Sequence, residues 1–158
     1  MAISVLLKDL TTGNTLCVAT THLKARSGAL MTSIRKEQGK ALLDFVHSTN
    51  ADCPVIICGD LNAEPNEPVY DIFCRNPMNL SSAYACEGKE PKYTSWKIRE
   101  DGEQCQTLDY VFYSKDHMQV DSVLEFPSSL ELGEHKLPSI VYPSDHLSLV
   151  CDLSFQST

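Results

Sequence analysis

The stretch VIICGDLNAEP, residues 55–65, joins an apolar run directly to a polar loop. Its first four residues have the composition of a strand that is buried on both faces. The run then meets Asp60 and Asn62, and the loop stops at Pro65. A hydrophobic core has no need of a carboxylate and an amide at this point. The two residues therefore either close an Asx turn or face a polar ligand that the fold holds.

Polar residues also stand at the ends of other segments with strand-like composition. Further strands are predicted at residues 2–8, 15–21, 108–113 and 147–153. If these strands are neighbours in one sheet, their ends converge on one rim, and alternate side chains share a face. That rim would gather the six polar residues His22, Asp60, Asn62, Asp109, Asp145 and His146.

Helical periodicity is found in two places. The first is residues 30–47, where the apolar positions are Ile34, Ala41, Leu42, Phe45 and Val46. This pattern places Arg35, Lys36 and Lys40 on the opposite, polar face. A short helix is predicted after Pro68, because proline is tolerated in a first turn.

Two segments show little regular structure. Residues 76–106 are predicted to be irregular apart from a strand-like piece at 93–96, and residues 125–143 are predicted to be linker-like. The whole pattern predicts one mixed α/β (α+β) domain over residues 1–158, with a largely antiparallel sheet.

The predicted rim suits metal-assisted hydrolysis of a phosphate ester. Mg²⁺ prefers oxygen ligands and keeps several waters, so one or two carboxylates suffice beside the substrate phosphate oxygens. A carboxylate can deprotonate the attacking water, and amide, imidazolium, Lys or Arg donors can stabilise the charge on phosphorus. Each residue alone also fits an ordinary role as a turn, cap or structural histidine. Their joint position at strand ends favours a site.

Composition narrows the class of ligand. The chain has 158 residues and a formal net charge of −8, and it contains no dense Lys/Arg cluster of the kind that binds duplex DNA. Its basic residues are grouped in HLKAR (22–26) and KIR (97–99). Such local groups suit a small anion, or a metal with phosphate, better than a long nucleic acid; the alternative is solvated surface charge.

The cysteines and the apolar runs indicate a compartment. Seven cysteines without a Cys-x-x-Cys pair favour reduced thiols over a disulfide framework or a zinc site. No apolar run is long enough to span a bilayer, and no signal peptide is evident. We therefore expect a cytoplasmic protein; a mitochondrial location would require a targeting segment upstream of Met1.

Four motifs resemble those of the endonuclease/exonuclease/phosphatase superfamily, in order and in spacing. They are THLKAR (21–26), GDLNAEP (59–65), TLDYVFYS (107–114) and YPSDHLSLVCDLSF (142–155). The first of them and YTSWKIR (93–99) are most similar to the nocturnin branch, which is related to the carbon catabolite repression deadenylases. The resemblance implies the C-terminal half of a DNase I-like two-layer α/β sandwich, with the N-terminal half absent.

The resemblance also implies roles for the first group of site residues. His22 would contact the scissile phosphate, and Asp60 would position and activate the attacking water. Asn62 would hydrogen-bond the phosphate, beside the loop backbone at Ala63.

The roles of the remaining residues follow in the same way. Asp109 would orient His146, which would bind the phosphate and stabilise the transition state. Asp145, together with Asp60, would stand at the site of Mg²⁺, where Mn²⁺ could also bind. The basic residues implied to face substrate phosphates are Lys24, Arg26 and Arg99.

Three functions remain open at this point. The leading one is Mg²⁺-dependent removal of the 2′-phosphate of NADP(H) to give NAD(H), which the acidic balance of the chain favours. The second is a poly(A)-specific 3′-exonuclease, or deadenylase, acting on RNA. The superfamily's principal metal ligand is a glutamate in a Gln-Glu motif, and this sequence contains no Gln-Glu dipeptide. The third is therefore an inactive interaction module, whose exposed sheet face binds the missing half or a partner protein.

Overall fold

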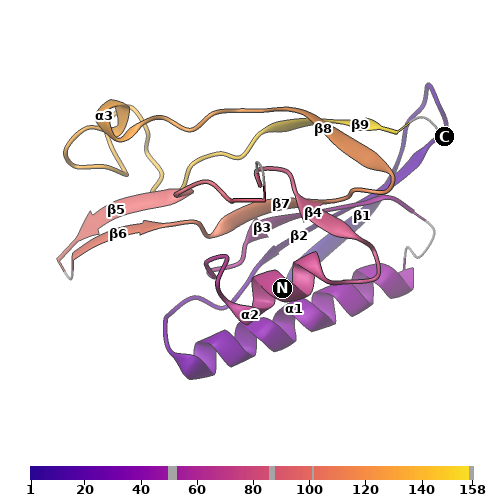
Figure 1. Cartoon of the computed structure of the whole chain (residues 1–158), viewed down its shortest axis with the longest axis horizontal. Coiled ribbons are helices and arrows are strands. Elements are labelled where there is room, and N and C mark those ends of the chain that lie inside the picture. Colours follow the sequence, from indigo (N-terminus) through magenta and orange to yellow (C-terminus); the bar gives the residue numbers. More distant parts are fainter. Residues whose placement is uncertain (50–52, 86–87, 101, 157–158) are drawn as a thin grey trace.

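The computed structural model of the chain describes residues 1–49, 53–85, 88–100 and 102–156. Its elements in chain order are β1 (Ala2–Lys8), β2 (Thr15–His22), α1 (Ala29–Thr49), β3 (Val55–Asp60), α2 (Pro68–Cys74), β4 (Leu80–Ser82), β5 (Ser95–Arg99), β6 (Gly102–Gln106), β7 (Asp109–Ser114), β8 (Met118–Val123), α3 (Ser129–Leu132) and β9 (Cys151–Phe155). Figure 1 shows α1 and α2 on one side of a central sheet and the β8–β9 ribbon on the other. The predicted mixed α/β class is confirmed.

The central sheet has the strand order β1-β2-β3-β7-β4. β2 and β3 are parallel, whereas the pairs β1–β2, β3–β7 and β7–β4 are antiparallel, so the sheet is largely antiparallel as predicted. Register decides the position of the site. His22 is paired with Asp60, and Asp60 is paired with Asp109. The ends of β2 and β3 and the start of β7 therefore lie side by side at one rim.

One face of the sheet builds the main core. Alternate residues of the central strands, among them Cys17, Val55, Ile57 and Phe112, point to the helix side and are almost fully buried. They pack against apolar residues of α1 and α2, which are Leu42, Leu43, Val46, Val69 and Phe73. Alternation with a period of two explains this burial, because side chains of the same parity share one face. The core fixes the strands that end at the rim.

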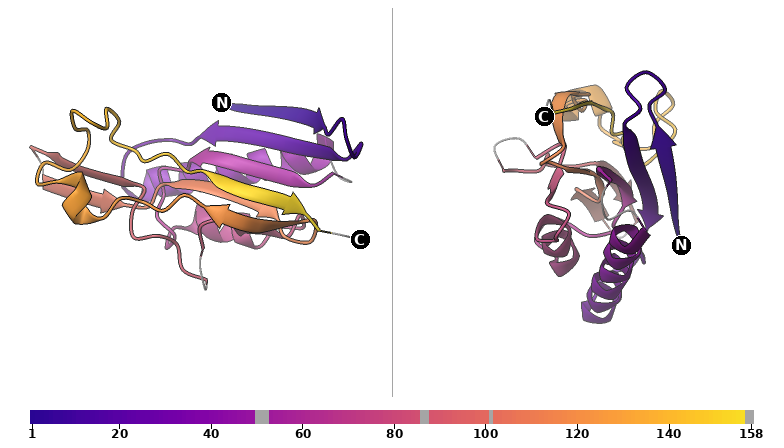
Figure 2. Two further views of the ribbon diagram at one scale, coloured as in Figure 1. Left: turned by 90° about the horizontal axis from the view of Figure 1, so that it is seen from above. Right: turned by 90° about the vertical axis from the view of Figure 1, so that its right-hand side faces the viewer.

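The opposite face of the sheet is apolar but less covered. The intervening residues of β1, which are Ile3, Val5 and Leu7, are 57%, 46% and 50% exposed. Their register partners on β2 include Leu16 and Val18, which are only half-buried. Figure 2 shows the β8–β9 ribbon lying beside β1 and β2 rather than across them. We call the surface of Ile3, Val5, Leu7, Leu16 and Val18 the open face.

Several predictions of burial were wrong. Arg35, predicted on the polar face of its helix, is only 2% exposed, whereas Phe45, predicted to face inward, is 48% exposed. Arg35 is buried because its guanidinium finds acceptors inside the fold, which a hydrophobic pattern cannot reveal. β3 is fully buried only on its helix side, at Val55 and Ile57.

Several element boundaries also differ from the sequence prediction. β4, β5 and β6 lie within the segment predicted to be irregular, and β8 was not predicted. The last strand begins at Cys151, since residues 147–150 have no strand pairing. The segment predicted as a linker contains α3 and the buried Leu137. In these polar segments pairing and packing, rather than local composition, create the structure.

Six of the seven cysteines lie among the described residues. The six cysteines that the structure describes are free, and Cys86 lies outside the described residues. Within the described part of the chain, no helix has the length and apolar character needed to cross a membrane.

Candidate phosphate and metal site

Asp60, Asp109 and His146 form one cluster at the rim of the sheet. A ligand atom from each lies within 4.8 Å of the others. Asp60 ends β3 and Asp109 begins the adjacent strand β7, so register alone brings the two carboxylates together. His146 comes from a segment that bridges to Ser95, the first residue of β5. Three sequence-distant predictions thus meet at one place.

Gly59 explains how Asp60 reaches this position. Its φ angle is +146°, and a Cβ atom there would lie 1.9 Å from the main-chain oxygen of Thr21. Only glycine permits this approach of β3 to β2. The Asx turn offered as the structural alternative is also present, since the Asn62 N–H donates to Asp60 Oδ1 at 2.7 Å. Turn and site therefore use the same carboxylate.

Two other predicted residues border Asp60. His22 Nε2 lies 3.4 Å from Asp60 Oδ2, and its side chain is 69% exposed. Asn62 has a left-handed backbone, with φ at +49°, and its side-chain amide donates to the main-chain oxygen of Leu23 at 3.2 Å. His22 thus faces solvent beside the cluster, while Asn62 ties the loop after β3 to the segment after β2.

The charges of the cluster are coupled. Burial raises the pKa of Asp60, and the nearby Asp109 carboxylate acts in the same direction. The hydrogen bond with Asp109 Oδ2, at 2.8 Å from His146 Nδ1, raises the pKa of His146 above 6.5 although burial opposes this. Asp109 therefore favours the protonated imidazole, with Nδ1–H directed at the carboxylate and Nε2–H available to a ligand.

Thr94 is a member of the site that sequence reasoning missed. Its hydroxyl, which is fully buried, accepts from the N–H groups of Leu108 and Asp109 at 2.9 and 3.1 Å. Its single hydrogen is then donated to Asp109 Oδ2 at 2.6 Å. Thr94 and His146 therefore both contact the same oxygen of the carboxylate, Oδ2. The sole signal in the sequence was its place in YTSWKIR.

Asp145 lies in an ion-pair cluster rather than in the carboxylate–imidazole cluster. Lys97 Nζ and Arg99 Nη2 lie 3.0 and 3.1 Å from Asp145 Oδ2. Partial burial acts to raise the pKa of Asp145, but the hydrogen bond and charge of Lys97 outweigh it and lower the pKa. Lys97 was assigned no role from the sequence, and the metal role of Asp145 stays a prediction.

The remaining predicted residues lie close to the rim along the chain. Lys24 and Arg26 are exposed, and neither has an ion pair among the described residues. Ala63 is fully buried, and its carbonyl oxygen accepts from the Tyr110 hydroxyl at 2.7 Å. Their predicted contacts with phosphate stay predictions.

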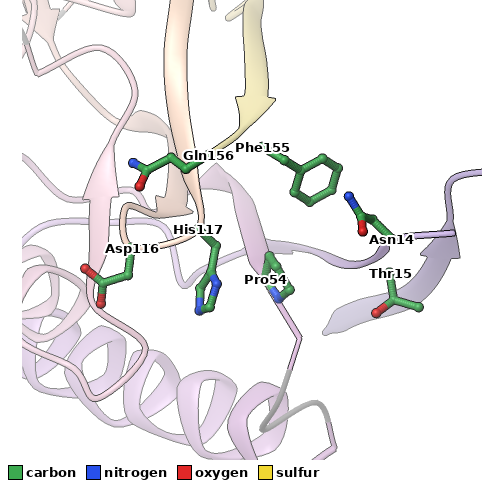
Figure 3. A pocket seen from close by; sticks show the side chains of 7 residues that line it. All are labelled: Asn14, Thr15, Pro54, Asp116, His117, Phe155 and Gln156. Carbon is green, nitrogen blue, oxygen red and sulfur yellow. The ribbon is translucent and has the colours of Figure 1, made fainter. Parts of the chain in front are cut away.

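A cavity of about 370 Å³ lies where β2 and β3 begin, and Figure 3 shows the side chains around it. It is lined by Asn14, Thr15, Pro54, Asp116, His117, Phe155 and Gln156. Thr15 begins β2 and Pro54 precedes β3, whereas the rim lies where these strands end. None of the residues predicted for the site lines this cavity.

The donor set at the rim fits a divalent cation. Asp60 and Asp109 offer carboxylate oxygens, which Mg²⁺ and Mn²⁺ accept, whereas His146, kept protonated by Asp109, offers its Nε2–H to a phosphate oxygen. Burial raises the pKa of Asp60, and a cation beside the carboxylate would lower that pKa again by favouring the charged form. The arrangement can hold a cation, a polarised water and a phosphate oxygen close together.

Comparison with known proteins agrees with this arrangement. The chain is 49% identical to nocturnin of Xenopus laevis over 161 residues and 44% identical to nocturnin of Drosophila melanogaster over 175 residues. These matches cover 98% and 96% of the chain, which spans only 41% and 27% of the respective relatives.

A solved structure and a family model extend the comparison. The human nocturnin catalytic domain, solved with a bound sulfate anion, superposes with a TM-score of 0.82 and 42% identity; the match covers 98% of this chain and 53% of that one. The model of the endonuclease/exonuclease/phosphatase family matches residues 18–146, which include the whole carboxylate–imidazole cluster. The chain therefore belongs to the endonuclease/exonuclease/phosphatase family, with nocturnins among its relatives.

Proposed function

We propose that the chain contributes the water-activating and phosphate-binding part of a divalent-metal-dependent phosphohydrolase. The proposed substrate is NADP(H), and the proposed reaction removes its 2′-phosphate to give NAD(H). The cluster of Asp60, Asp109 and His146 within 4.8 Å is the observation that carries this proposal. A hydrolase of phosphate esters needs a base, a proton-bearing imidazole and oxygen ligands in one place, and the cluster supplies all three.

The residues would divide the work as follows. Asp60, whose pKa is raised chiefly by burial, accepts the proton of the attacking water. His146, held protonated by Asp109, donates from Nε2 to a phosphate oxygen, and the exposed His22 donates from the other side of Asp60. Asp60, together with the sequence-predicted Asp145, would hold Mg²⁺ or Mn²⁺. The cation, when bound, supplies Lewis-acid neutralisation of phosphate charge.

Charge supports a compact dinucleotide over a long RNA. The chain has a net charge of −8, so a polyanion that runs across its surface meets overall repulsion. A dinucleotide instead needs a few local cations: Lys24 and Arg26 are exposed on the segment after β2, and Arg99 is exposed although it is paired with Asp145. The human nocturnin catalytic domain carries a bound sulfate, a tetrahedral anion with the shape of phosphate.

The test measures phosphate released from NADP⁺ in the presence of Mg²⁺. Asp60→Asn and Asp109→Asn remove the base and the carboxylate that orients His146, and each is expected to lower the rate by roughly 100-fold or more. Asp71→Asn is the matched control, because Asp71 is exposed on α2 and its ion pair among the described residues is with Arg75. Release of phosphate that is unaffected by both rim substitutions contradicts the proposal.

A 3′-exonuclease is the second candidate, because it needs the same cluster. The same preparation is incubated with oligo(A), and released AMP is measured beside the phosphate released from NADP⁺. If AMP is released faster than phosphate, and if this release depends on Asp60, then RNA and not the dinucleotide is the substrate.

The open face favours a third role, as an interaction module. Ile3, Val5 and Leu7 present an uncharged apolar surface on an edge strand, which a partner sheet can cover. The proposed partner is the part of a nocturnin catalytic domain that this chain does not span, as the same or a separate polypeptide. Co-purification with that part of the Xenopus laevis relative is expected to be lost with Val5→Glu. Leu6→Glu, on the other face of the same strand, is the control.

A further inference from the structure

Arg35 is a buried cation whose side chain connects three separate segments. It extends from α1 and is 2% exposed. Nε and Nη2 donate to the Glu67 carboxylate at 2.7–3.2 Å, next to the start of α2. Nη1 donates to the main-chain oxygens of Lys24 and Arg26, at 3.1 and 2.7 Å. Nη2 also donates to the Thr32 hydroxyl at 3.3 Å, so the guanidinium bonds one carboxylate, one hydroxyl of its own helix and the backbone of the basic segment.

Stability alone does not account for a buried ion pair of this kind. Replacing such a pair by well-packed apolar residues is often neutral or stabilising, because burial removes the hydration of both charges. Gly39, Leu42 and Val46 on the same helix are buried against apolar neighbours, so an apolar residue would suit this layer. What an apolar residue could not provide is two hydrogen bonds to carbonyl groups of residues 24 and 26.

Those two carbonyls belong to a segment that has no regular structure of its own. Residues 23–28 lie between β2 and α1 without helix or strand pairing, and Arg26 has a left-handed backbone with φ at +83°. A second side chain from α1 also holds this segment, since Gln38 Oε1 accepts from the Lys24 N–H at 2.9 Å. Arg35 and Gln38 are one turn apart, so they share a helix face.

The other end of the segment is fixed to the rim. The Leu23 N–H donates to the Asp60 main-chain oxygen at 2.9 Å, and the Leu23 oxygen accepts from the Asn62 amide at 3.2 Å. The segment is therefore hydrogen-bonded to the rim at its start and to side chains of α1 further along. The same segment carries two exposed cations, Lys24 and Arg26, which have no ion-pair partner in the described parts of the chain.

We propose that Arg35, assisted by Gln38, is the positioning residue of a phosphate-reading arm formed by Lys24 and Arg26. Hydrogen bonds hold the arm to both the rim and α1, so it selects substrates that carry a second phosphate group away from the one that is cleaved. Arg35 does not touch the substrate and acts through the backbone that it holds. This inference rests on the proposed function for its ligand class, a phosphate ester.

The decisive experiment compares two probes. NADP⁺ carries a 2′-phosphate and a separate pyrophosphate, whereas 2′-AMP carries only the 2′-phosphate. Calorimetric titration in EDTA, where metal-dependent turnover is prevented, gives the affinity of each variant for both probes. Arg35→Met and Arg35→Lys are expected to weaken NADP⁺ binding on the order of tenfold and 2′-AMP binding by less than about twofold, because charge-assisted hydrogen bonds from a misplaced arm are lost. Lysine is expected to weaken binding as methionine does, because its single ammonium group cannot bond the Glu67 carboxylate and the two main-chain carbonyls in the planar geometry of a guanidinium.

Matched variants separate positioning from folding. Arg75→Met removes the 79% exposed arginine that follows α2 and, among the described residues, forms an ion pair with Asp71; it is expected to change neither affinity. If the Arg35 variants do not fold, Gln38→Met decides, because it releases only the Lys24 N–H and leaves no buried charge; a loss of about two- to fivefold confined to NADP⁺ is expected.

The outcomes distinguish this inference from the proposed function. Equal weakening of both probes, or wild-type affinity in the folded variants, overturns the role of Arg35 even where NADP⁺ is hydrolysed. Selective weakening of NADP⁺ without any hydrolysis by the unmodified chain supports the arm and defeats the hydrolase proposal. Failure of the unmodified chain to bind NADP⁺ overturns the arm.

Discussion

Replacing Gly59 by alanine tests the geometry that places Asp60 at the rim. The alanine is expected to lower the free energy of unfolding in two ways, through backbone strain and through overpacking. A left-handed or mirror-extended backbone costs a residue with a Cβ atom about 1–3 kcal/mol, and φ at Gly59 is +146°. The added methyl would also lie 1.9 Å from the Thr21 main-chain oxygen. Because that carbonyl is part of a strand and cannot rotate away, overpacking adds about 1–3 kcal/mol more. The sum, about 2–6 kcal/mol, is a large fraction of the stability of a small domain.

Gly102→Ala provides the matched control. Gly102 has a similar φ of +127°, but a Cβ atom there would meet nothing within 4 Å, so only the backbone cost applies. Urea unfolding followed by the fluorescence of the single tryptophan, Trp96, gives both free energies of unfolding. Gly59→Ala is expected to destabilise the chain by at least about 1 kcal/mol more than the control. Equal destabilisation would refute the close approach of β2 and β3.

Three further predictions concern buried groups. Thr94→Val is expected to cost about 2–4 kcal/mol in urea unfolding, since two buried N–H groups and Asp109 lose a partner, whereas Thr94→Ser costs less than about 1 kcal/mol. Burial raises the pKa of Glu90 above 4.5 in the folded state, so its stabilising contribution is present at low pH and is lost as the pH rises through the folded pKa. Glu90→Gln is therefore expected to raise the urea midpoint at pH 8 and leave it unchanged near pH 4; a gain at pH 4 alone contradicts the sign. Gly39→Ala is expected to lower the melting temperature despite better helix propensity, because the new methyl would lie 2.7 Å from Val69; a higher melting temperature means that α2 moves freely.

Much of the fold follows from local patterns in the sequence. The strands that carry His22, Asp60 and Asp109 are apolar or alternating, and Gly13 and Pro54 precede the first two of them, so periodicity located them. β5 overlaps the strand-like piece predicted at 93–96, whereas β6 escaped prediction because its sequence GEQCQ, residues 102–106, is polar. Its strand character comes from pairing with β5 and not from composition.

The residues of the site likewise include some that the sequence predicts and some that it does not. The cluster was predictable because its residues stand at strand ends, where register brings them together. Thr94, Lys97 and Arg35 were not, because each acts through a hydrogen bond or ion pair to a residue distant in sequence. Such contacts leave no periodic trace. A buried arginine in particular has the same letter as one in solvent, and only its partners distinguish the two.

The cluster at the rim draws on both ends of the sequence, and this has a consequence for biosynthesis. Strands with residues 22 and 60 leave the ribosome well before residue 146, the imidazole that Asp109 holds. A nascent polypeptide therefore carries no assembled centre until the segment around residue 146 has emerged and docked against β5. The ring signals of that histidine in a proton NMR spectrum accordingly report completed folding, not the earlier formation of the sheet.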